Sequence, residues 1–339
     1  MTPEVVARMV TGAVTLSAVA LSVGACALVL GFEDHEPFPT GQGGAGAGGG
    51  GAGGAGPGGG GFGGSGGFEG IDVLLIPESS MDSVGMYDPM DGTYLGDFLP
   101  PPTGAEPYQF TTPNNAIQGP DGRIYVSDQI TDAIVRFEPD GTFESIFADS
   151  VTYGGIDNVR GMQFRGNELF ASVSPGAAEF NDAVARFDID GNYLGNFVED
   201  SSDPFDVLFT SAGTMMVANI ADPDDIRLYD VDGTSFMDLL DINFPQQIQP
   251  LPDGSYVTAA WTEVTQFTID GTVVRSIVGL SSCSGVYPLD DGQWLITSDD
   301  GVQSINPFSM MVIDTKRVGT AFRKVERVTL PVETVMGAR

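Results

Sequence analysis

Polar side chains that could bind a ligand recur along this chain, each close to the start or the end of a strand-like segment. The clearest are Asn115, Asp128, Asn158, Arg160, Asp206 and Gln247. Carboxylate and amide oxygens are the ligands that hard cations such as Ca²⁺ and Mg²⁺ prefer. The same groups also hydrogen-bond water or a polar ligand. They therefore predict a polar binding surface, provided that the fold brings such distant residues to one place.

Chemistry that depends on histidine or on paired cysteines is excluded for most of the chain. The only histidine is His35, and the only cysteines are Cys26 and Cys283. Beyond residue 70 there is therefore no His-based triad, His general base or His metal site. A single cysteine in this part cannot form an internal disulfide or a zinc cluster. With no histidine to activate it, Cys283 is predicted to be a small buried core residue.

The segments that would position these side chains form a repeat. The phrase aromatic–Asp–x–(x)–Asp–Gly, with Glu or Thr in place of the first Asp in two copies, occurs five times. Its glycines lie 49, 50, 42 and 38 residues apart, at Gly92, Gly141, Gly191, Gly233 and Gly271. A second turn glycine returns at Gly122, Gly166, Gly213, Gly254 and Gly292. With strand-like segments on either side, a period of this size is typical of the four-stranded blades of a β-propeller.

The Asp-Gly phrases are predicted to be hairpin turns rather than calcium loops. Glycine adopts a positive φ at little cost, and aspartate caps a turn well. An EF-hand loop needs glycine at its sixth position and glutamate at its twelfth. In Asp188-Ile-Asp190-Gly191 the glycine comes fourth, and a strand follows at once.

The fold class predicted is all-β, a six-bladed β-propeller of four-stranded antiparallel blades over residues 71–331. Six outer strands can be counted, at residues 94–99, 143–147, 193–198, 236–240, 273–278 and 311–318. The first unit begins late, because residues 72–76 match the second strand of a blade. Residues 322–330 supply a spare strand, which we predict completes the first blade and closes the ring. Closure removes exposed sheet edges. Residues 332–339 are predicted to be a tail.

The blade pattern also predicts the side on which each loop lies. In such a blade, the loop between strands one and two shares a face with the loop between strands three and four. Both Asp-Gly turns therefore fall on one face, here called the turn face. The starts of the innermost strands and the loops between strands two and three fall on the opposite face, the channel face. All six polar side chains named above belong to the channel face, together with Asn219 and Trp261.

The blades also resemble those of known families. The phrase x-Asp-Gly-x-(Ile/Leu)-Tyr-Val-(Ser/Ala), followed by Phe-Asp-x-Asp-Gly, resembles NHL-repeat and SMP-30/gluconolactonase-like six-bladed propellers over about residues 71–331. The resemblance implies the fold. Metal-dependent lactonases of this kind further imply a Glu/Asn/Asp set that holds a cation on the channel face. Only Asn158 and Asp206 match such a set, because Glu78 follows a second strand. Many unrelated functions share this fold, so activity needs separate argument.

The first 70 residues are predicted to export and tether the domain. Met9 to Phe32 is an uncharged, largely apolar run, and Val23-Gly24-Ala25-Cys26 resembles a bacterial lipobox, which predicts lipidation of Cys26. An uncleaved membrane anchor and a cleaved signal peptide are the alternatives. Residues 1–32 are then the targeting segment, and the glycine-rich residues 33–70 form a flexible, disordered linker. Each alternative exports the domain; a lipoprotein would sit on the inner or outer membrane, in the periplasm or at the cell surface.

The formal net charge of −32 disfavours binding to nucleic acid or to an anionic membrane surface. Membrane contact is expected through the N-terminal anchor alone, and a monomer is expected. The predicted function is a binding module for a protein, peptide or glycan. The alternative is a Ca²⁺- or Mg²⁺-dependent hydrolase or lactonase of the SMP-30 kind. Binding of channel water is a third role open to the same polar residues.

Overall fold

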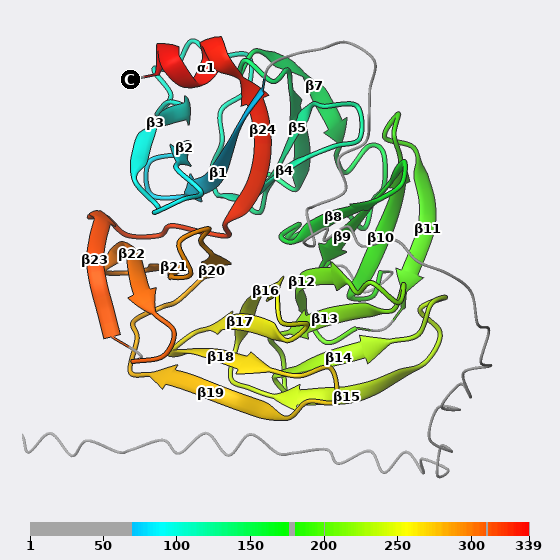
Figure 1. Cartoon of the computed structure of the whole chain (residues 1–339). Coiled ribbons are helices and arrows are strands. Elements are labelled where there is room, and N and C mark those ends of the chain that lie inside the picture. The colour runs from blue at the N-terminus through cyan, green and yellow to red at the C-terminus, as the bar shows by residue number, and fades with distance from the viewer. Residues whose placement is uncertain (1–69, 176–179, 200, 310, 339) are drawn as a thin grey trace, which may run out of the picture. The chain divides into compact units, whose positions relative to one another are not determined.

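A ring of six β-sheets makes up the domain (Figure 1). The computed structural model describes residues 70–338, except 176–179, 200 and 310. Each sheet has four antiparallel strands, so the predicted six-bladed propeller is confirmed. The predictions for residues 1–69, which include lipidation of Cys26, the anchor and the linker, lie outside the described residues.

The blades are numbered in chain order. Blade 1 contains β24 (Glu326–Pro331), β1 (Gly70–Glu78), β2 (Ser83–Tyr87) and β3 (Tyr94–Leu99). Blade 2 contains β4 (Pro113–Gln118), β5 (Ile124–Asp128), β6 (Ala133–Phe137) and β7 (Phe143–Ala148). Blade 3 contains β8 (Met162–Arg165), β9 (Glu168–Val173), β10 (Ala183–Asp188) and β11 (Tyr193–Val198).

The second half of the ring repeats this order. Blade 4 contains β12 (Pro204–Phe209), β13 (Met215–Asn219), β14 (Asp225–Tyr229) and β15 (Phe236–Asp241). Blade 5 contains β16 (Pro245–Pro250), β17 (Tyr256–Ala260), β18 (Glu263–Phe267) and β19 (Val273–Val278). Blade 6 contains β20 (Gly285–Pro288), β21 (Trp294–Ser298), β22 (Gly301–Asn306) and β23 (Met311–Arg317).

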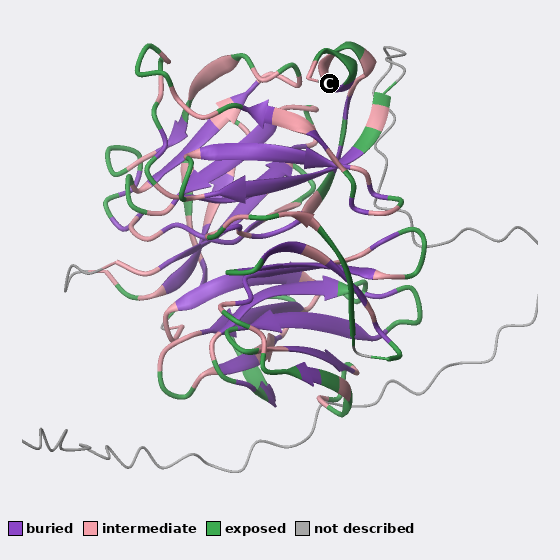
Figure 2. Cartoon of the chain, turned by 90° about the vertical axis from the view of Figure 1, so that its left-hand side faces the viewer, coloured by how far each residue is buried: buried purple, intermediate pink, exposed green. Residues whose placement is uncertain are grey.

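The core consists of the layers between neighbouring blades. The second strands β5, β13, β17 and β21 are buried along their whole length, whereas the outer strands β19 and β23 are mostly exposed. In Figure 2 most of the strands are purple, and the exposed residues are found largely in the loops. A strand that is covered on both faces has no solvent side, so its sequence is a nearly continuous apolar run. This explains why apolar residues predominate in these four second strands.

The Asp-Gly phrases form hairpin turns, as predicted. In blade 2, Gly141 has a φ of 86°, and Asp140 Oδ1 accepts a hydrogen bond from Thr142 N at 2.8 Å. That bond holds the pKa of the Asp140 carboxyl below its usual value. Glycine is required here for a second reason. A Cβ at three of these turns would collide with an outer-strand carbonyl of the preceding blade: Gly191 with Phe147, Gly233 with Phe197 and Gly271 with Leu239.

The two ends of the described chain close the ring within blade 1. Strand β24 pairs with β1 in antiparallel register from Gly70↔Pro331 to Leu75↔Glu326. The prediction that residues near 322–330 complete the first blade is confirmed. The strand itself begins later than predicted, at Glu326, because residues 322–325 cross the centre of the ring instead.

The predicted tail contains a short helix, α1 (Val332–Gly337). Its Val335 is buried against the blade 1 core. Pro331 precedes the helix, and no side chain caps its start. Within the described part of the chain, no helix has the length and apolar character needed to cross a membrane.

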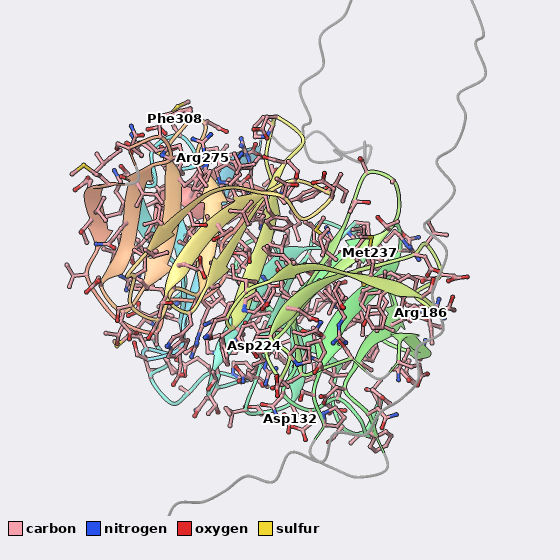
Figure 3. The ribbon with its side chains drawn as sticks, turned by 90° about the horizontal axis from the view of Figure 1, so that it is seen from below. Asp132, Arg186, Asp224, Met237, Arg275 and Phe308 are labelled. Carbon is pink, nitrogen blue, oxygen red and sulfur yellow. The ribbon has the colours of Figure 1, made fainter. Side chains whose placement is uncertain are left out.

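The two faces of the ring are distinguished as predicted. Figure 3 shows Asp132 and Asp224 toward one side of the ring and Phe308 at the opposite side. Asp132 and Asp224 lie between the second and third strands of blades 2 and 4, and Phe308 lies in the β22–β23 turn. Asp132 and Asp224 therefore mark the channel face, and Phe308 marks the turn face.

Candidate functional site

One position at the start of each innermost strand links neighbouring blades. Its occupants, in blades 2 to 6 and then blade 1, are Asn115, Gly161, Asp206, Gln247, Gly285 and Lys324. Three of them accept a backbone hydrogen bond from the next blade: Asn115 Oδ1 from Met162 N (3.0 Å), Asp206 Oδ2 from Ile248 N (2.8 Å) and Gln247 Oε1 from Val286 N (3.0 Å). These three predicted site residues therefore hold blades in register. We call this set the ring position.

The second oxygen of Asp206 is paired with Lys324. Lys324 Nζ lies 2.7 Å from Asp206 Oδ1, and it also donates to Phe205 O at 2.5 Å. Asp206 is 4% exposed and Lys324 is 0% exposed. Burial raises the pKa of the Asp206 carboxyl and lowers the pKa of the Lys324 ammonium, while each charge opposes the shift of the other. A buried ion pair needs its remaining polar groups satisfied, and here Phe205 O and Ile248 N do this.

Gln247 binds the backbone of the chain's last segment. Its Oε1 accepts from Val325 N at 3.0 Å, and its Nε2 donates to Val325 O at 2.8 Å. The Gln247 side chain is fully buried. It therefore acts as a clamp between blade 5 and the segment that leads into β24.

That segment lies at the centre of the ring, since several blades contact it. Arg323 N donates to Pro77 O in blade 1, and Thr297 Oγ1 in blade 6 donates to Arg323 O, both at 2.8 Å. The next residue, Lys324, reaches blade 4. Residues 323–325 therefore join blades 1, 4, 5 and 6 through polar contacts.

Two glycines at the ring position make room for the long side chains. A Cβ at Gly161 would lie 2.5 Å from Asp206 Oδ1 and 2.6 Å from Lys324 Nζ. A Cβ at Gly285 would lie 2.6 Å from Arg323 O. Small and long residues therefore complement each other around the ring.

Gly161→Ala is expected to destabilise the fold by about 1–3 kcal/mol, because the added methyl group enters the space of the Asp206–Lys324 pair. Urea unfolding measures the effect. Gly337→Ala is the matched control, since no atom lies within 4 Å of a Cβ there. An unchanged unfolding midpoint for Gly161→Ala would mean that Lys324 does not lie over this glycine.

Asn158 and Asp128 organise loops on the channel face. Asn158 N donates to Asp132 Oδ1 at 3.0 Å, and its Nδ2 donates to Ser174 O at 3.3 Å. The Asp128 carboxylate accepts four hydrogen bonds from the preceding and following loops, from Tyr108 Oη, Thr111 N, Thr112 N and Thr131 Oγ1. Both side chains thus have structural partners; binding of a ligand by either stays a prediction.

The two residues predicted for a metal, Asn158 and Asp206, already have partners within the protein. Both oxygens of Asp206 are hydrogen-bonded, and the cation beside it is the Lys324 ammonium. The buried Glu78 pairs with Arg317, with Oε2 and Nη2 2.9 Å apart. In the described ranges, no group of three or more His, Cys, Asp or Glu residues is placed to hold a metal. A Ca²⁺ or Mg²⁺ site at Asn158 and Asp206 stays a prediction, which titration of the protein with the cation would test.

Some buried amide atoms of the channel face lack a hydrogen-bond partner among the described residues. They are Gln246 Nε2 and Oε1, Asn114 Oδ1 and Asn115 Nδ2. All three side chains are at most 1% exposed. Ordered water commonly satisfies buried groups of this kind. Water in the central channel can therefore supply the hydrogen bonds that these amide atoms lack.

Glu326, the first residue of β24, places another carboxyl group beside Asp206 and Lys324. Its Oε1 accepts hydrogen bonds from Gln247 Nε2 at 3.1 Å and from Gln249 Nε2 at 3.3 Å. Burial, reinforced by the Asp206 charge, raises the pKa of the Glu326 carboxyl to about 7, although Lys324 and the two amides oppose the shift.

The raised pKa of Glu326 predicts a pH-dependent stability. The folded chain binds this proton more tightly than the unfolded chain does, so the stabilisation is present below pH 4.5 and is lost as the pH rises to about 7. Glu326→Gln keeps the acceptor oxygen and removes the titration. Between these pH values, the wild type should lose about 1–3 kcal/mol relative to Glu326→Gln in urea unfolding. Parallel stability profiles for the two proteins would contradict this assignment.

An aromatic cluster of Phe205, Phe244 and Trp261 lies beside the ring position. The ring centroids of Phe205 and Phe244 are 6.0 Å apart, and those of Phe244 and Trp261 are 5.3 Å apart. Phe205 is buried, whereas Trp261 is 44% exposed. Two cations lie over Phe205, the Arg160 guanidinium at 4.9 Å and Lys324 Nζ at 5.1 Å from the ring centroid. The cluster thus leads from the buried ion pair to an exposed tryptophan.

The predicted site residue Arg160 belongs to the buried end of this cluster. It is 6% exposed, and its Nη1 lies 2.5 Å from Asp203 Oδ1. Nη1 also donates to Pro204 O at 3.3 Å. Arg160 therefore joins blade 3 to blade 4, and its charge is neutralised within the protein.

Trp261 is exposed, but its backbone is fixed on both sides. Trp261 N donates to Phe244 O at 3.2 Å, and Trp261 O accepts from Cys283 N at 2.9 Å. These bonds join the β17–β18 turn to the start of blade 5 and to blade 6. The indole ring is therefore presented from a rigid position on the channel face.

Phe244 has a left-handed backbone, with a φ of 54°. Phe244 lies three positions before the ring position of blade 5. The equivalent residues of blades 3, 4, 6 and 1 also have a left-handed backbone, with φ from 48° to 59°; they are Asn158, Asp203, Ser282 and Ala321. Asparagine and aspartate tolerate left-handed φ best, and a bulky residue there is an outlier. The repeat thus requires a left-handed backbone at this position, but it does not require a phenylalanine there. Strain of this kind often marks functional sites.

Cys283 is a buried core residue, as predicted. Its side chain is fully buried, and burial raises the pKa of the thiol to about 12. The thiol stays protonated at neutral pH and is not an available nucleophile.

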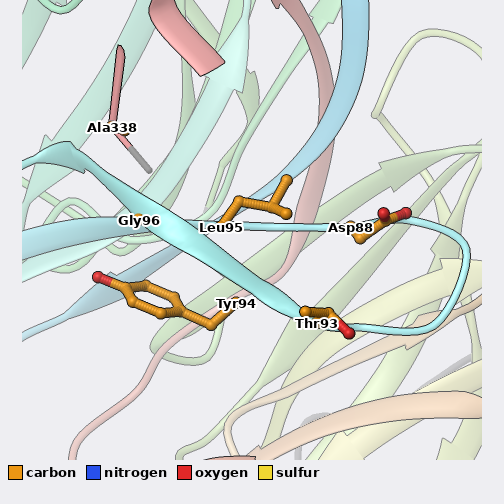
Figure 4. Close-up of a pocket in the computed structure, with 6 residues that line it drawn as sticks. All are labelled: Asp88, Thr93, Tyr94, Leu95, Gly96 and Ala338. Atoms are coloured by element: carbon orange, nitrogen blue, oxygen red, sulfur yellow. The ribbon is translucent and has the colours of Figure 1, made fainter. Parts of the chain in front are cut away.

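A hollow of about 530 Å³ lies beside the outer strand of blade 1 (Figure 4). Its lining residues are Asp88, Thr93, Tyr94, Leu95, Gly96 and Ala338. Asp88 is the only carboxylate among these side chains, and it accepts a turn hydrogen bond from Met90 N at 2.9 Å. The lining lacks a second acid or base, so we assign no chemistry to this hollow.

No protein-family model and no curated protein matches this chain. Solved structures with a similar fold do exist. The structure of a nidogen/laminin complex covers 76% of this chain and 98% of its own, at 14% identity and a TM-score of 0.60. A gluconolactonase from Xanthomonas campestris covers 67% of this chain and 79% of its own, at 16% identity and a TM-score of 0.55. A Bacteroides caccae protein of unknown function covers 76% and 98%, at 12% identity and a TM-score of 0.53.

At these identities the similarity shows the fold alone. It confirms that the chain folds like gluconolactonase-type and related propellers, as its repeats predicted. One of these structures is described as a gluconolactonase and another as part of a nidogen/laminin complex. Because one fold supports such different proteins, the function of this chain must be argued from its own residues.

Sequence analysis missed two features of this site, Lys324 and the conformation of Phe244. Lys324 could have been found, because it lies 39 residues after Gly285 and so continues the repeat at the ring position. The left-handed φ of Phe244 has no local signal, since phenylalanine does not favour it.

Proposed function

We propose that this propeller is an exported binding module, tethered through its N-terminal segment, that binds a protein, peptide or glycan at the channel face. The observation that carries the proposal is the rigid exposure of Trp261. Its side chain is 44% exposed, although its backbone is hydrogen-bonded to Phe244 and Cys283. Large aromatic side chains in fixed positions give binding energy at a low cost in conformational entropy.

The contacts of the channel residues support binding over hydrolysis. Asp206 is paired with Lys324, and Cys283 is buried and protonated. A general base must reach its substrate and have a pKa near the working pH. Glu326 meets the second condition, but its Oε1 accepts hydrogen bonds from Gln247 and Gln249.

Peptide and glycan arrays probed with the labelled full-length chain test the binding proposal. The wild type should bind a subset of probes, and Trp261→Ala should lose them. Phe308→Ala is the matched control, because Phe308 is an 81% exposed aromatic residue on the turn face. If no bound probe depends on Trp261, the proposed binding surface is wrong.

A second experiment tests the hydrolase alternative. The full-length chain is titrated with CaCl₂ while its melting temperature and its hydrolysis of gluconolactone are measured. A binding module should show neither calcium-dependent stabilisation through Asp206 nor lactone hydrolysis. A stabilisation abolished by Asp206→Asn, together with hydrolysis lost in Glu326→Gln, would favour the hydrolase.

A further inference from the structure

We infer that the group anchored at this surface is cationic, an arginine or lysine side chain of a basic peptide segment that binds between Trp261 and Asp224. The inference rests on the proposed function and specifies the class of its ligand. It is argued from the geometry around Phe244, from the charges near it and from the contacts of the aromatic cluster.

Trp261 and Asp224 flank the same residue, Phe244. Asp224 Oδ2 accepts a hydrogen bond from Phe244 N at 3.2 Å, and Trp261 N donates to Phe244 O at 3.2 Å. Asp224 is half-buried, and only its Oδ2 takes part in the side-chain hydrogen bonds seen among the described residues. Phe244 therefore links both residues: its N–H binds the Asp224 carboxylate, its carbonyl binds the Trp261 backbone, and its ring packs on the exposed Trp261 ring at 5.3 Å between centroids.

Such a pair suits a guanidinium or an ammonium group. Cations are attracted to the faces of aromatic rings within about 6 Å, and tryptophan is the best partner. A nearby carboxylate adds a charge-assisted hydrogen bond. The buried end of the same cluster already shows this preference, because Arg160 and Lys324 both lie over Phe205.

The charges around the cluster favour a cation over an anionic or neutral ligand. Both nearby cations are neutralised, Arg160 by Asp203 and Lys324 by Asp206. Asp222, two residues before Asp224, is exposed. The chain as a whole carries a net charge of −32. Its field would therefore attract a basic segment and repel an acidic one, whereas a neutral ligand would gain nothing from it.

The left-handed Phe244 gives the inference an independent test. Blade 3 has asparagine at this position with a φ of 48°, so Phe244→Asn fits the same backbone. The substitution removes the ring that packs against Trp261. We expect Phe244→Asn to fold cooperatively but to bind a basic peptide at least about tenfold more weakly, because Trp261 loses its support.

Calorimetric titration of the full-length chain with an octa-arginine peptide, at about 0.15 M salt, tests the inference. Trp261→Ala should weaken binding at least about tenfold, Trp261→Phe should be intermediate, and Asp224→Asn should weaken binding about three- to tenfold. Phe308→Ala and Asp270→Asn should bind like the wild type, since both residues are exposed on the turn face. Circular dichroism of each variant confirms that it is folded.

Each other outcome overturns the inference in a distinguishable way. If Asp270→Asn weakens binding as much as Asp224→Asn does, the peptide is held by diffuse charge alone. If the peptide does not bind but a neutral oligosaccharide such as chitohexaose binds through Trp261, the cationic ligand class is wrong and the proposed function stands. If neither probe and no array member depends on Trp261, both proposals fail.

Discussion

Deletion of residues 320–339 is expected to abolish the cooperative folding of the propeller. The deletion removes β24 and leaves the inner edge of β1 unpaired from Gly70 to Leu75. It also removes Phe322, Val325 and Leu330, which are at most 1% exposed. Because each fully buried apolar side chain contributes about 1.5–3 kcal/mol, these losses are comparable with the roughly 5–15 kcal/mol by which a typical domain is stable. The unpaired strand edge should also promote aggregation.

Differential scanning calorimetry of the truncated chain measures this effect. Deletion of residues 332–339 alone is the matched control, because it removes α1 and keeps β24 and the central segment. The control should keep a cooperative transition at a lower temperature. A chain without residues 320–339 that melts like the full-length protein would contradict closure of the ring by β24.

Asp206→Asn is expected to destabilise the domain by about 3–5 kcal/mol, because it leaves the Lys324 ammonium buried without its charged partner. Lys324→Met should have a similar effect, since it leaves the Asp206 carboxylate unpaired. The double variant Asp206→Asn/Lys324→Met should cost less than the sum of the single changes by at least about 2 kcal/mol. Asparagine still accepts the hydrogen bond from Ile248 N.

Urea unfolding of the four proteins gives this double-mutant cycle. Asp232→Asn is a control at an exposed turn position, where the change should be within about 0.5 kcal/mol. If the effects of the two single changes simply add, Asp206 and Lys324 do not form the pair described here, and Asp206 becomes available to a metal or a substrate.

The architecture could be predicted because its signals are local. Turn glycines such as Gly141 and Gly191 need a positive φ, and their spacing gives the period of the blades directly. The missing first strand of blade 1 and the spare strand at the end of the chain then follow from counting. Helix α1 was missed because Pro331 stands where a Ser, Thr, Asp or Asn would signal a helix start.

The roles of the site residues could not be predicted in the same way. Asp206 and Gln247 were recognised as channel-face residues, but what a polar side chain does there depends on its partner. The partner of Asp206 is 118 residues away, at Lys324, and that of Gln247 is 78 residues away, at Val325. Such contacts leave no mark in the local sequence. Once they are known, residues that suggested a ligand site prove to join blades, and attention moves to Trp261.

The fluorescence of Trp261 during titration with the octa-arginine peptide tests the central claim most directly. The chain has two tryptophans, and Trp294 is only 4% exposed, so Trp294→Phe leaves Trp261 as the single reporter. We predict a saturable change in Trp261 emission, with the same midpoint as the calorimetric titration, that Asp224→Asn weakens and that Asp270→Asn does not. Emission that stays constant while the peptide binds would show that the ligand sits elsewhere and would contradict the account.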